Sequence, residues 1–202
     1  DPSQIEHSLA TPLQSVVSSD GLTLYTAAFG SAKVGVFSTA SIEDPAFETN
    51  FDPTAESANY IDTGGGPCGL VLDETNGRLY VFTRFDNTLA SIDLGSKATL
   101  ETHALHNPEP QSIVDGRPFL YDAANTSGNG EASCSSCHIF GDTDQLAWNL
   151  GDPDASVSSN TQPSAIGLLP AQPFFHPMKG PMTTQTLKGL STHGGMHWRG
   201  DR

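Results

Sequence analysis

The fold of this chain is decided by three short apolar runs that follow one another: Gly69-Leu70-Val71-Leu72-Asp73, Arg78-Leu79-Tyr80-Val81-Phe82 and Leu89-Ala90-Ser91-Ile92-Asp93. Branched aliphatic and aromatic residues dominate these runs, as they do in the strands of antiparallel sheets. Turn signals separate the runs, at Thr75-Asn76-Gly77 and at Asp86-Asn87. The stretch therefore predicts an antiparallel meander.

The same pattern occurs once before in the chain. Its runs are Gln14-Ser15-Val16-Val17, Leu22-Thr23-Leu24-Tyr25-Thr26-Ala27 and Val34-Gly35-Val36-Phe37, and Tyr25 and Tyr80 hold matching places in the two copies. Residues 38–62 are polar and contain Pro45 and Pro53, so we expect a long connection there, with room for one short strand. Two copies of one meander predict an all-β, antiparallel N-terminal part.

A second feature is the motif Cys134-Ser135-Ser136-Cys137-His138. C-x-x-C-H is the attachment pattern of c-type haem, in which two thiols bond to the haem vinyl groups and the imidazole ligates iron. A redox dithiol has no use for His138, and a zinc site needs further ligands, while the chain has no second C-x-x-C. The motif therefore predicts one covalent haem c with His138 as proximal ligand. Cys68 is left over, and we expect it to be small, buried and inert.

The composition limits the partners and the compartment. The 202 residues include 23 Asp and Glu against 9 Lys and Arg, for a formal net charge of −14. Such a surface repels nucleic acid and anionic lipid, so we expect neither as a partner. No apolar run is long enough to cross a membrane, and Asp1-Pro2-Ser3 does not open a signal peptide. Because bacteria attach haem c outside the cytoplasm, we expect a periplasmic or otherwise extracytoplasmic protein, with its signal removed, or a fragment.

The pattern changes after residue 94. Residues 103–110 read as a linker because Pro108 and Pro110 break regular structure. Residues 111–124 predict a helix that is interrupted at Pro118. We therefore place a domain boundary near residue 108, between a β-domain (1–108) and a haem c-binding cytochrome domain (109–202).

The β-domain carries a resemblance to a known repeat. The stretch from Gly66-Pro67-Cys68-Gly69-Leu70 through Leu79-Tyr80-Val81 resembles the repeats of bacterial YVTN-type β-propellers. The resemblance implies that the two meanders are partial propeller blades. A closed ring typically needs about four blades or more, so either upstream sequence or a partner chain would complete the β-domain.

The second half resembles the bacterial di-haem cytochrome c peroxidase family, which includes MauG-like enzymes. The likeness covers about residues 111–202 and is carried by residues 117–122, 126–130, 133–138, 176–190 and 197–202. It implies a mostly α, loop-rich cytochrome c domain, with Trp198 as an electron conduit near the haem. Members of the family carry a second C-x-x-C-H, whereas this chain stops at Arg202 without one and looks like a fragment. Whether it is an enzyme stays open, because peroxidase chemistry in the family uses two haems.

The second axial ligand of the iron is open among six residues: His176, Met178, Met182, His193, Met196 and His197. We prefer His176 or Met178 because Pro177 and Pro181 stiffen the loop that carries them. A thioether ligand raises the haem potential, a second imidazole lowers it, and an open position admits peroxide or small ligands.

Other side chains have two readings each. Trp198, if it is not a conduit, packs its ring against the porphyrin. Arg199 and Arg202 either pair with the haem propionates or lie in solvent. Trp148 is expected in the wall of the haem pocket. Four aspartates either bind Ca²⁺ or are solvated, since their spacing is not that of an EF-hand: Asp142, Asp144, Asp152 and Asp154.

These features predict a c-type cytochrome that passes electrons through its haem as part of a di-haem peroxidase-like protein. Its partner would be a redox protein or a membrane redox complex. The alternative is a haem-bearing accessory subunit that docks through its β-repeats onto a larger membrane or multi-haem redox complex. A second haem and an open iron position would separate the two.

Overall fold

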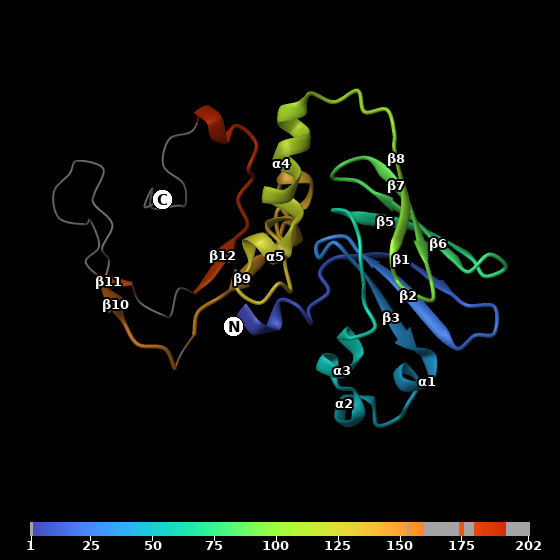
Figure 1. The fold of residues 1–202 in the computed structure, drawn as a ribbon. Coiled ribbons are helices and arrows are strands. Elements are labelled where there is room, and N and C mark those ends of the chain that lie inside the picture. The colour runs from blue at the N-terminus through green and yellow to red at the C-terminus, as the bar shows by residue number, and fades with distance from the viewer. Residues whose placement is uncertain (1, 153, 160–173, 176–179, 193–202) are drawn as a thin grey trace. The chain divides into compact units, whose positions relative to one another are not determined.

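Figure 1 shows the computed structural model of the protein, which describes residues 2–152, 154–159, 174–175 and 180–192. The chain divides into two compact units, Asp1–Ser136 and Cys137–Arg202. The predicted domain boundary near residue 108 concerns independent folding, which this division does not test, and it stays a prediction. Within the described ranges, no helix is both long enough and apolar enough to span a membrane.

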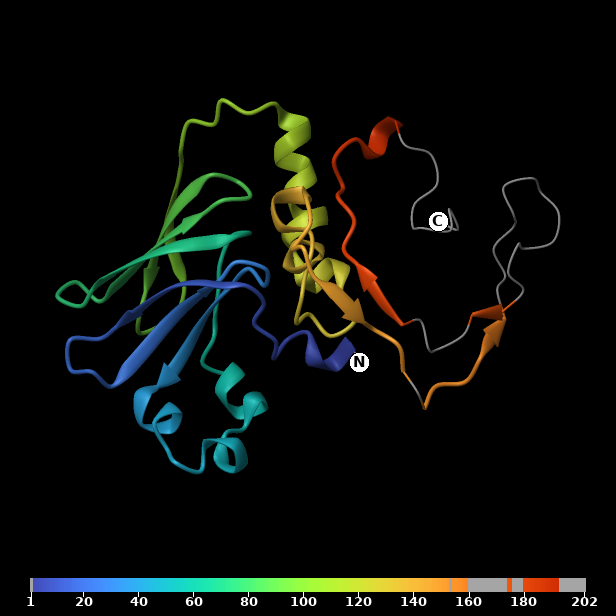
Figure 2. The same cartoon turned by 180° about the vertical axis from the view of Figure 1, so that it is seen from behind.

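The first unit contains two four-stranded sheets, each an antiparallel meander whose strands pair in chain order (Figures 1 and 2). The first sheet consists of β1 (Pro12–Val17), β2 (Thr23–Ala28), β3 (Lys33–Ser38) and β4 (Ile61–Asp62). The second consists of β5 (Pro67–Asp73), β6 (Arg78–Thr83), β7 (Thr88–Asp93) and β8 (Thr99–Ala104). The two predicted meanders are confirmed. The connection that was expected to have room for one short strand ends in β4. The strand β8 was not predicted.

Strand register explains which side chains face the core. Across β5 and β6, Leu72 lies opposite Leu79 and Leu70 lies opposite Val81. Residues opposite one another in an antiparallel pair point to the same face, so these four share one side of the sheet. The turn between the strands ends at Gly77, whose φ of +62° is left-handed and costs glycine little.

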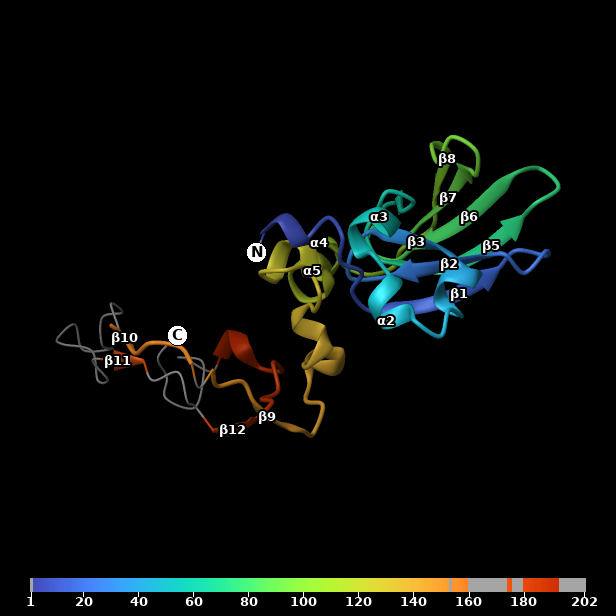
Figure 3. The same cartoon turned by 90° about the horizontal axis from the view of Figure 1, so that it is seen from below.

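One hydrophobic cluster joins the two sheets. Its buried members are Ala27, Val34, Ile61, Leu70, Leu79, Val81, Ala90 and Ile92. The strand β5 contacts both β1 and β2, which lie beside it in Figure 3. Full burial of a Val, Leu or Ile side chain stabilises the fold by about 1.5–3 kcal/mol, so this cluster is the main source of cohesion in the unit.

Three short helices fill the connection between β3 and β4 (Figure 1). They are α1 (Thr39–Ile42), α2 (Phe47–Asn50) and α3 (Pro53–Ser57). The start of α3 is capped, because the Asp52 carboxylate accepts a hydrogen bond from the Thr54 N–H at 3.0 Å. The ring of Phe37 in β3 packs against Phe51 and Tyr60. The insertion thus covers part of the outer face of the first sheet.

Two helices, α4 (Gln111–Tyr121) and α5 (Ala123–Thr126), follow the second sheet. The predicted helix is present, but its interruption at Pro118 was wrong, since α4 runs on past that residue. Pro118 lacks only its own N–H, and its carbonyl still accepts from the Asp122 N–H at 2.9 Å. The break comes at Asp122, which is extended and whose carboxylate caps α5 through the Asn125 N–H.

The side chain of Arg117 fastens α4 to the second sheet. It is 7% exposed and donates to the carbonyls of Arg84 at 2.7 Å and Phe85 at 2.8 Å. It also pairs with the carboxylate of Glu109. Arg84 pairs with the same carboxylate at 3.1 Å, so one acidic group joins two cations that come from different elements.

The second unit has no α-helix among its described residues. It holds two short antiparallel pairs, β9 (Ala147–Asn149) with β12 (Pro181–Thr183) and β10 (Ser158–Ser159) with β11 (Phe174–Phe175). The remaining elements are 3₁₀ turns: η3 (Ile139–Gly141) and η4 (Leu190–Thr192), with η1 (Pro2–Gln4) and η2 (Cys134–Ser136) in the first unit. A mostly α cytochrome domain is therefore not seen in the part described. Residues 138–159 are rich in Gly, Asp and Ser, which favour turns over helix.

Candidate haem-attachment site

The first cysteine of the C-x-x-C-H motif lies on η2, which packs against α4. The Ser136 N–H closes this turn by donating to the Ser133 carbonyl at 3.0 Å. The hydroxyls of Ser133 and Ser135 are 2.7 Å apart and both residues are buried. Because the two serines occupy the interior, the thiol of Cys134 is turned outward and is exposed and free.

The next two motif residues belong to the second unit, where Cys137 and His138 are both half-buried. The Nδ1 atom of His138 lies 2.7 Å from the main-chain carbonyl oxygen of Gln185. A carbonyl can only accept, so Nδ1 carries the hydrogen, and in the neutral ring Nε2 carries the lone pair. Histidines that ligate metals almost always donate their other ring N–H to a carbonyl, a carboxylate or water. His138 thus presents the ligating nitrogen that a haem iron requires.

A set of contacts holds the Gln185 carbonyl in place. The Leu187 N–H donates to the Gly141 carbonyl at 2.9 Å, and Lys188 pairs with the Asp142 carboxylate. The pair with Lys188 is the main cause that lowers the pKa of Asp142, and the Thr186 hydroxyl adds to it. These bonds join the turn after His138 to the segment after Gln185.

The apolar side chains of the second unit also fit a haem. None of those described is buried, and the large exposed ones are Ile139, Phe140, Leu146, Trp148, Leu150, Val157, Phe174, Met182 and Leu190. Soluble proteins rarely leave so many apolar groups of one unit in water. A porphyrin is itself largely apolar. The motif's donor atoms and these side chains together suit a haem that acts as part of the unit's core.

Most of the other predicted site residues fall outside the described part of the chain. These are His176, Met178, His193, Met196, His197, Trp198, Arg199 and Arg202. Among the six candidate axial ligands, only Met182 is described. It lies in β12 opposite Trp148 of β9. The indole N–H of Trp148 donates to the Asp144 carboxylate at 2.7 Å and its ring is 40% exposed; its place in a haem pocket stays a prediction.

The four aspartates are not gathered around a cation. Over the residues described, there is no group of three or more His, Cys, Asp or Glu side chains placed to hold a metal ion. Asp142 is engaged by Lys188, Asp144 by Trp148, and Asp152 accepts from the Asp154 N–H. Calcium stays a prediction without support in this part of the chain.

Cys68 lies in β5 and is half-buried, with its thiol 3.7 Å from the Phe82 carbonyl. Burial raises the pKa of this thiol, which keeps it protonated and poorly nucleophilic. Its expected inert character agrees with this setting, although the side chain is less deeply buried than expected.

Two elements of the site, and one cavity elsewhere in the chain, were not predictable from residue types. Gln185 acts through its main-chain carbonyl, so its side chain gives no signal in the sequence. The ion pair between Asp142 and Lys188 joins residues 46 positions apart. A cavity of about 280 Å³ in the first unit was also missed.

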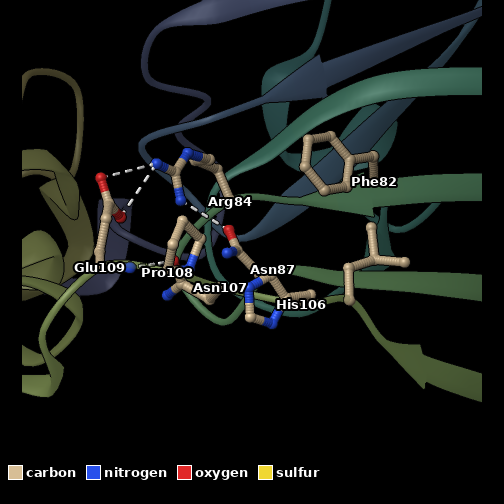
Figure 4. Close-up of a pocket in the computed structure, with 8 residues that line it drawn as sticks. Phe82, Arg84, Asn87, His106, Asn107, Pro108 and Glu109 are labelled. Atoms are coloured by element: carbon tan, nitrogen blue, oxygen red, sulfur yellow. Dashed lines mark hydrogen bonds and ion pairs between the residues drawn. The ribbon is translucent and has the colours of Figure 1, made fainter.

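That cavity lies where β6, β7 and the chain after β8 meet (Figure 4). It is lined by Phe82, Arg84, Asn87, Leu105, His106, Asn107, Pro108 and Glu109. Figure 4 shows the guanidinium of Arg84 turned toward Glu109 and Asn87, which it contacts at 3.1 Å and 2.6 Å. The charged groups in this wall satisfy one another, so the cavity presents no free charge of its own to a ligand.

Comparisons with known proteins place the chain in no family. No family model matches it, and no curated protein matches it. Among solved structures, it is similar to hydrazine synthase of Kuenenia stuttgartiensis, with a TM-score of 0.37 and 20% identity. The match covers 50% of this chain and 26% of that one, so the chain spans about a quarter of the length of that protein. Similarity at this level carries no functional conclusion, and membership of the di-haem peroxidase family stays a prediction.

Proposed function

We propose that this chain is a c-type cytochrome that carries one covalent haem and passes electrons outside the cytoplasm. The observation that supports it best is the hydrogen bond from His138 Nδ1 to the Gln185 carbonyl, at 2.7 Å. That bond orients the imidazole and leaves Nε2 as the ligand, in the residue that the motif assigns to iron.

Each residue of the motif has a defined task. The thiols of Cys134 and Cys137 would each hold the haem by adding across a vinyl group, with the sulfur bonding to one carbon and the hydrogen going to the other, so that no electrons would be gained or lost. His138 would hold the iron through Nε2. When bound, haem supplies one-electron iron chemistry. The exposed apolar side chains of the second unit would exclude water from its faces, which favours the uncharged environment that raises a haem potential.

The proposed function also indicates what kind of partner the chain would bind and how its β-part would be completed. With 23 acidic against 9 basic residues, the chain would dock on a redox protein or membrane complex that presents a basic patch. The two meanders would be blades of an incomplete β-propeller, finished by another part of the protein or by a partner chain. Peroxidase activity would need a second haem, and His176 or Met178 remains our preferred second ligand.

A docking role for the β-part is the second candidate. The strand β8 lies at the edge of its sheet, and all six of its residues are exposed. An exposed edge presents unpaired main-chain groups to which another strand can add. In that case the chain would be an accessory subunit whose haem serves as a relay within a larger redox complex.

The test is the haem content of the full chain produced in a periplasm with its cytochrome c maturation machinery. The unaltered protein should retain haem through denaturation, and the Cys134→Ala, Cys137→Ala double variant should lose it. Cys68→Ala is the matched control and should retain haem in full. Equal haem retention in the double variant, or none in the unaltered protein, would contradict the proposal.

A further inference from the structure

We infer that Asp142 and Lys188 are positioning residues for His138, and that residues 181–188 lie on the same side of the iron as His138. This inference rests on the proposed haem function. It assigns a task to side chains outside the C-x-x-C-H motif and removes Met182 from the possible second ligands.

The imidazole ring fixes the direction. Its two nitrogens lie at different edges of the ring, so the carbonyl that receives the Nδ1 hydrogen lies away from whatever binds Nε2. The Gln185 carbonyl is at 2.7 Å from Nδ1. Iron on Nε2 would therefore have Gln185 behind the imidazole, on its proximal side.

Contacts of the residues that follow Gln185 hold its carbonyl in place. Thr186 and Lys188, on either side of Leu187, both bond to the Asp142 carboxylate. Leu187 itself donates to the Gly141 carbonyl at 2.9 Å. Asp142 follows His138 by only four positions. Its carboxylate therefore joins the segment after Gln185 to the turn that follows His138. We call Asp142, Thr186 and Lys188 the proximal clamp.

The position of Met182 follows from the same geometry. It precedes Gln185 by three residues, a stretch of chain that spans at most about 10 Å. A side chain that held the iron opposite His138 would need a longer stretch of chain between it and Gln185 than these three residues provide. Met182 is also paired with Trp148 through β9 and β12, which holds it in a short sheet. A thioether at that place supports the proximal side and does not bind the iron.

The clamp has a consequence for the redox potential. A hydrogen bond from Nδ1 to a carbonyl makes the imidazole a stronger donor to the metal, and a stronger donor favours the oxidised iron. Breaking the ion pair would let the carbonyl move, weaken that hydrogen bond and raise the midpoint potential. The motif itself would be untouched, so haem attachment should not change.

The experiment uses the full haem-loaded chain and compares Asp142→Asn, Lys188→Gln and Met182→Leu with Asp154→Asn as control. Asp154 is an exposed aspartate of the same unit that is outside the clamp. Potentiometric titration should give a higher midpoint potential for Asp142→Asn and Lys188→Gln than for the unaltered protein and the control. Asp142→Glu should restore part of the shift. Met182→Leu should keep the optical and EPR signatures of the iron ligands.

Each result decides between two outcomes. Unchanged midpoint potentials in both Asp142→Asn and Lys188→Gln would overturn the positioning role. Loss of an iron–thioether absorption band in Met182→Leu would overturn the placement of Met182. If Asp142→Asn is poorly folded, Lys188→Gln alone carries the test of the clamp. If the unaltered chain carries no covalent haem, the proposed function has failed, which is a different result from haem attached with unshifted potentials.

Discussion

At the residue scale, the hydrogen-bond partner of one imidazole nitrogen decides what His138 can do. The sequence motif predicts that His138 ligates iron, but which nitrogen is free depends on Gln185, 47 positions away. No sequence pattern predicts that contact, because every residue has a main-chain carbonyl that can accept a hydrogen bond. Single-sequence reasoning can therefore find a ligand, whereas its orientation needs the fold.

Acid should release the proximal clamp. The pKa of Asp142 is lowered below its ordinary value, chiefly by the Lys188 ammonium. A lowered pKa in the folded protein means that the ion pair is fully present above the ordinary value and is lost as the pH falls through the lowered one. The midpoint potential should therefore rise as the solution is acidified through that range.

The measurement is a titration of midpoint potential against pH for the unaltered protein and for Asp142→Asn. The variant should show a flatter profile in the acid range, since it has no carboxylate to protonate. Identical profiles would mean that another group controls the potential.

Arg117 is the second single residue with a large expected effect. Its buried guanidinium donates to two main-chain carbonyls and pairs with Glu109. Removing one partner of a buried pair typically costs about 3–5 kcal/mol, because the groups left behind remain desolvated. Since Glu109 is itself partly exposed, we expect Arg117→Met to lower the free energy of unfolding by the smaller of these values, about 3 kcal/mol.

Urea unfolding of the full chain measures this loss. Arg78→Met is the control, because Arg78 is only half-buried in β6 and its charge acts on Asp73 and Asp93, which are also only half-buried. A loss in Arg117→Met no larger than in the control would show that the guanidinium does not fasten α4 to the sheet.

At the element scale, the strands were predictable where they alternate and are bounded by turns. Leu79-Tyr80-Val81 alternates between core and outer face as its register requires. The strand β8 was missed because all six of its residues are exposed, so it has no apolar face to reveal it. The helices α1 to α3 were missed because helices of four and five residues span little more than one turn, too short to show a repeated apolar spacing.

The strand register predicts opposite outcomes for two neighbouring strands. Leu79 is fully buried in the cluster that joins the sheets, whereas Val71 is 62% exposed on the other face. Truncation of a buried leucine leaves a cavity, so Leu79→Ala should cost about 2–5 kcal/mol of unfolding free energy. Val71→Ala should change it by no more than about 0.5 kcal/mol.

The same urea experiment compares both variants. Equal losses would mean that the outer face of the second sheet is covered in solution, for example by a further blade or a partner strand. Such a result would point to the completed β-domain that the repeat resemblance implies.

At the scale of the whole molecule, the sequence anticipated the two meanders of the β-part but not the architecture after α5, and the haem chemistry of the motif stays a prediction. The first unit has its own buried cluster, and its strands other than β4 and β8 follow from hydrophobic alternation and turn signals. In the second unit, none of the apolar side chains whose burial is described is buried, so alternation and helical periodicity there do not mark a protein core. Polar turn-forming residues dominate residues 138–159, and these favour turns over the helices that the family resemblance implied.

The most direct measurement is the intact mass of the chain purified from a cytochrome c-maturing periplasm, together with its reduced alkaline pyridine spectrum. We predict the mass of the polypeptide plus one haem, and the spectrum of a haem whose two vinyl groups have been saturated by thioether bonds. The mass of the polypeptide alone, or a spectrum of haem with free vinyl groups, would contradict a c-type cytochrome.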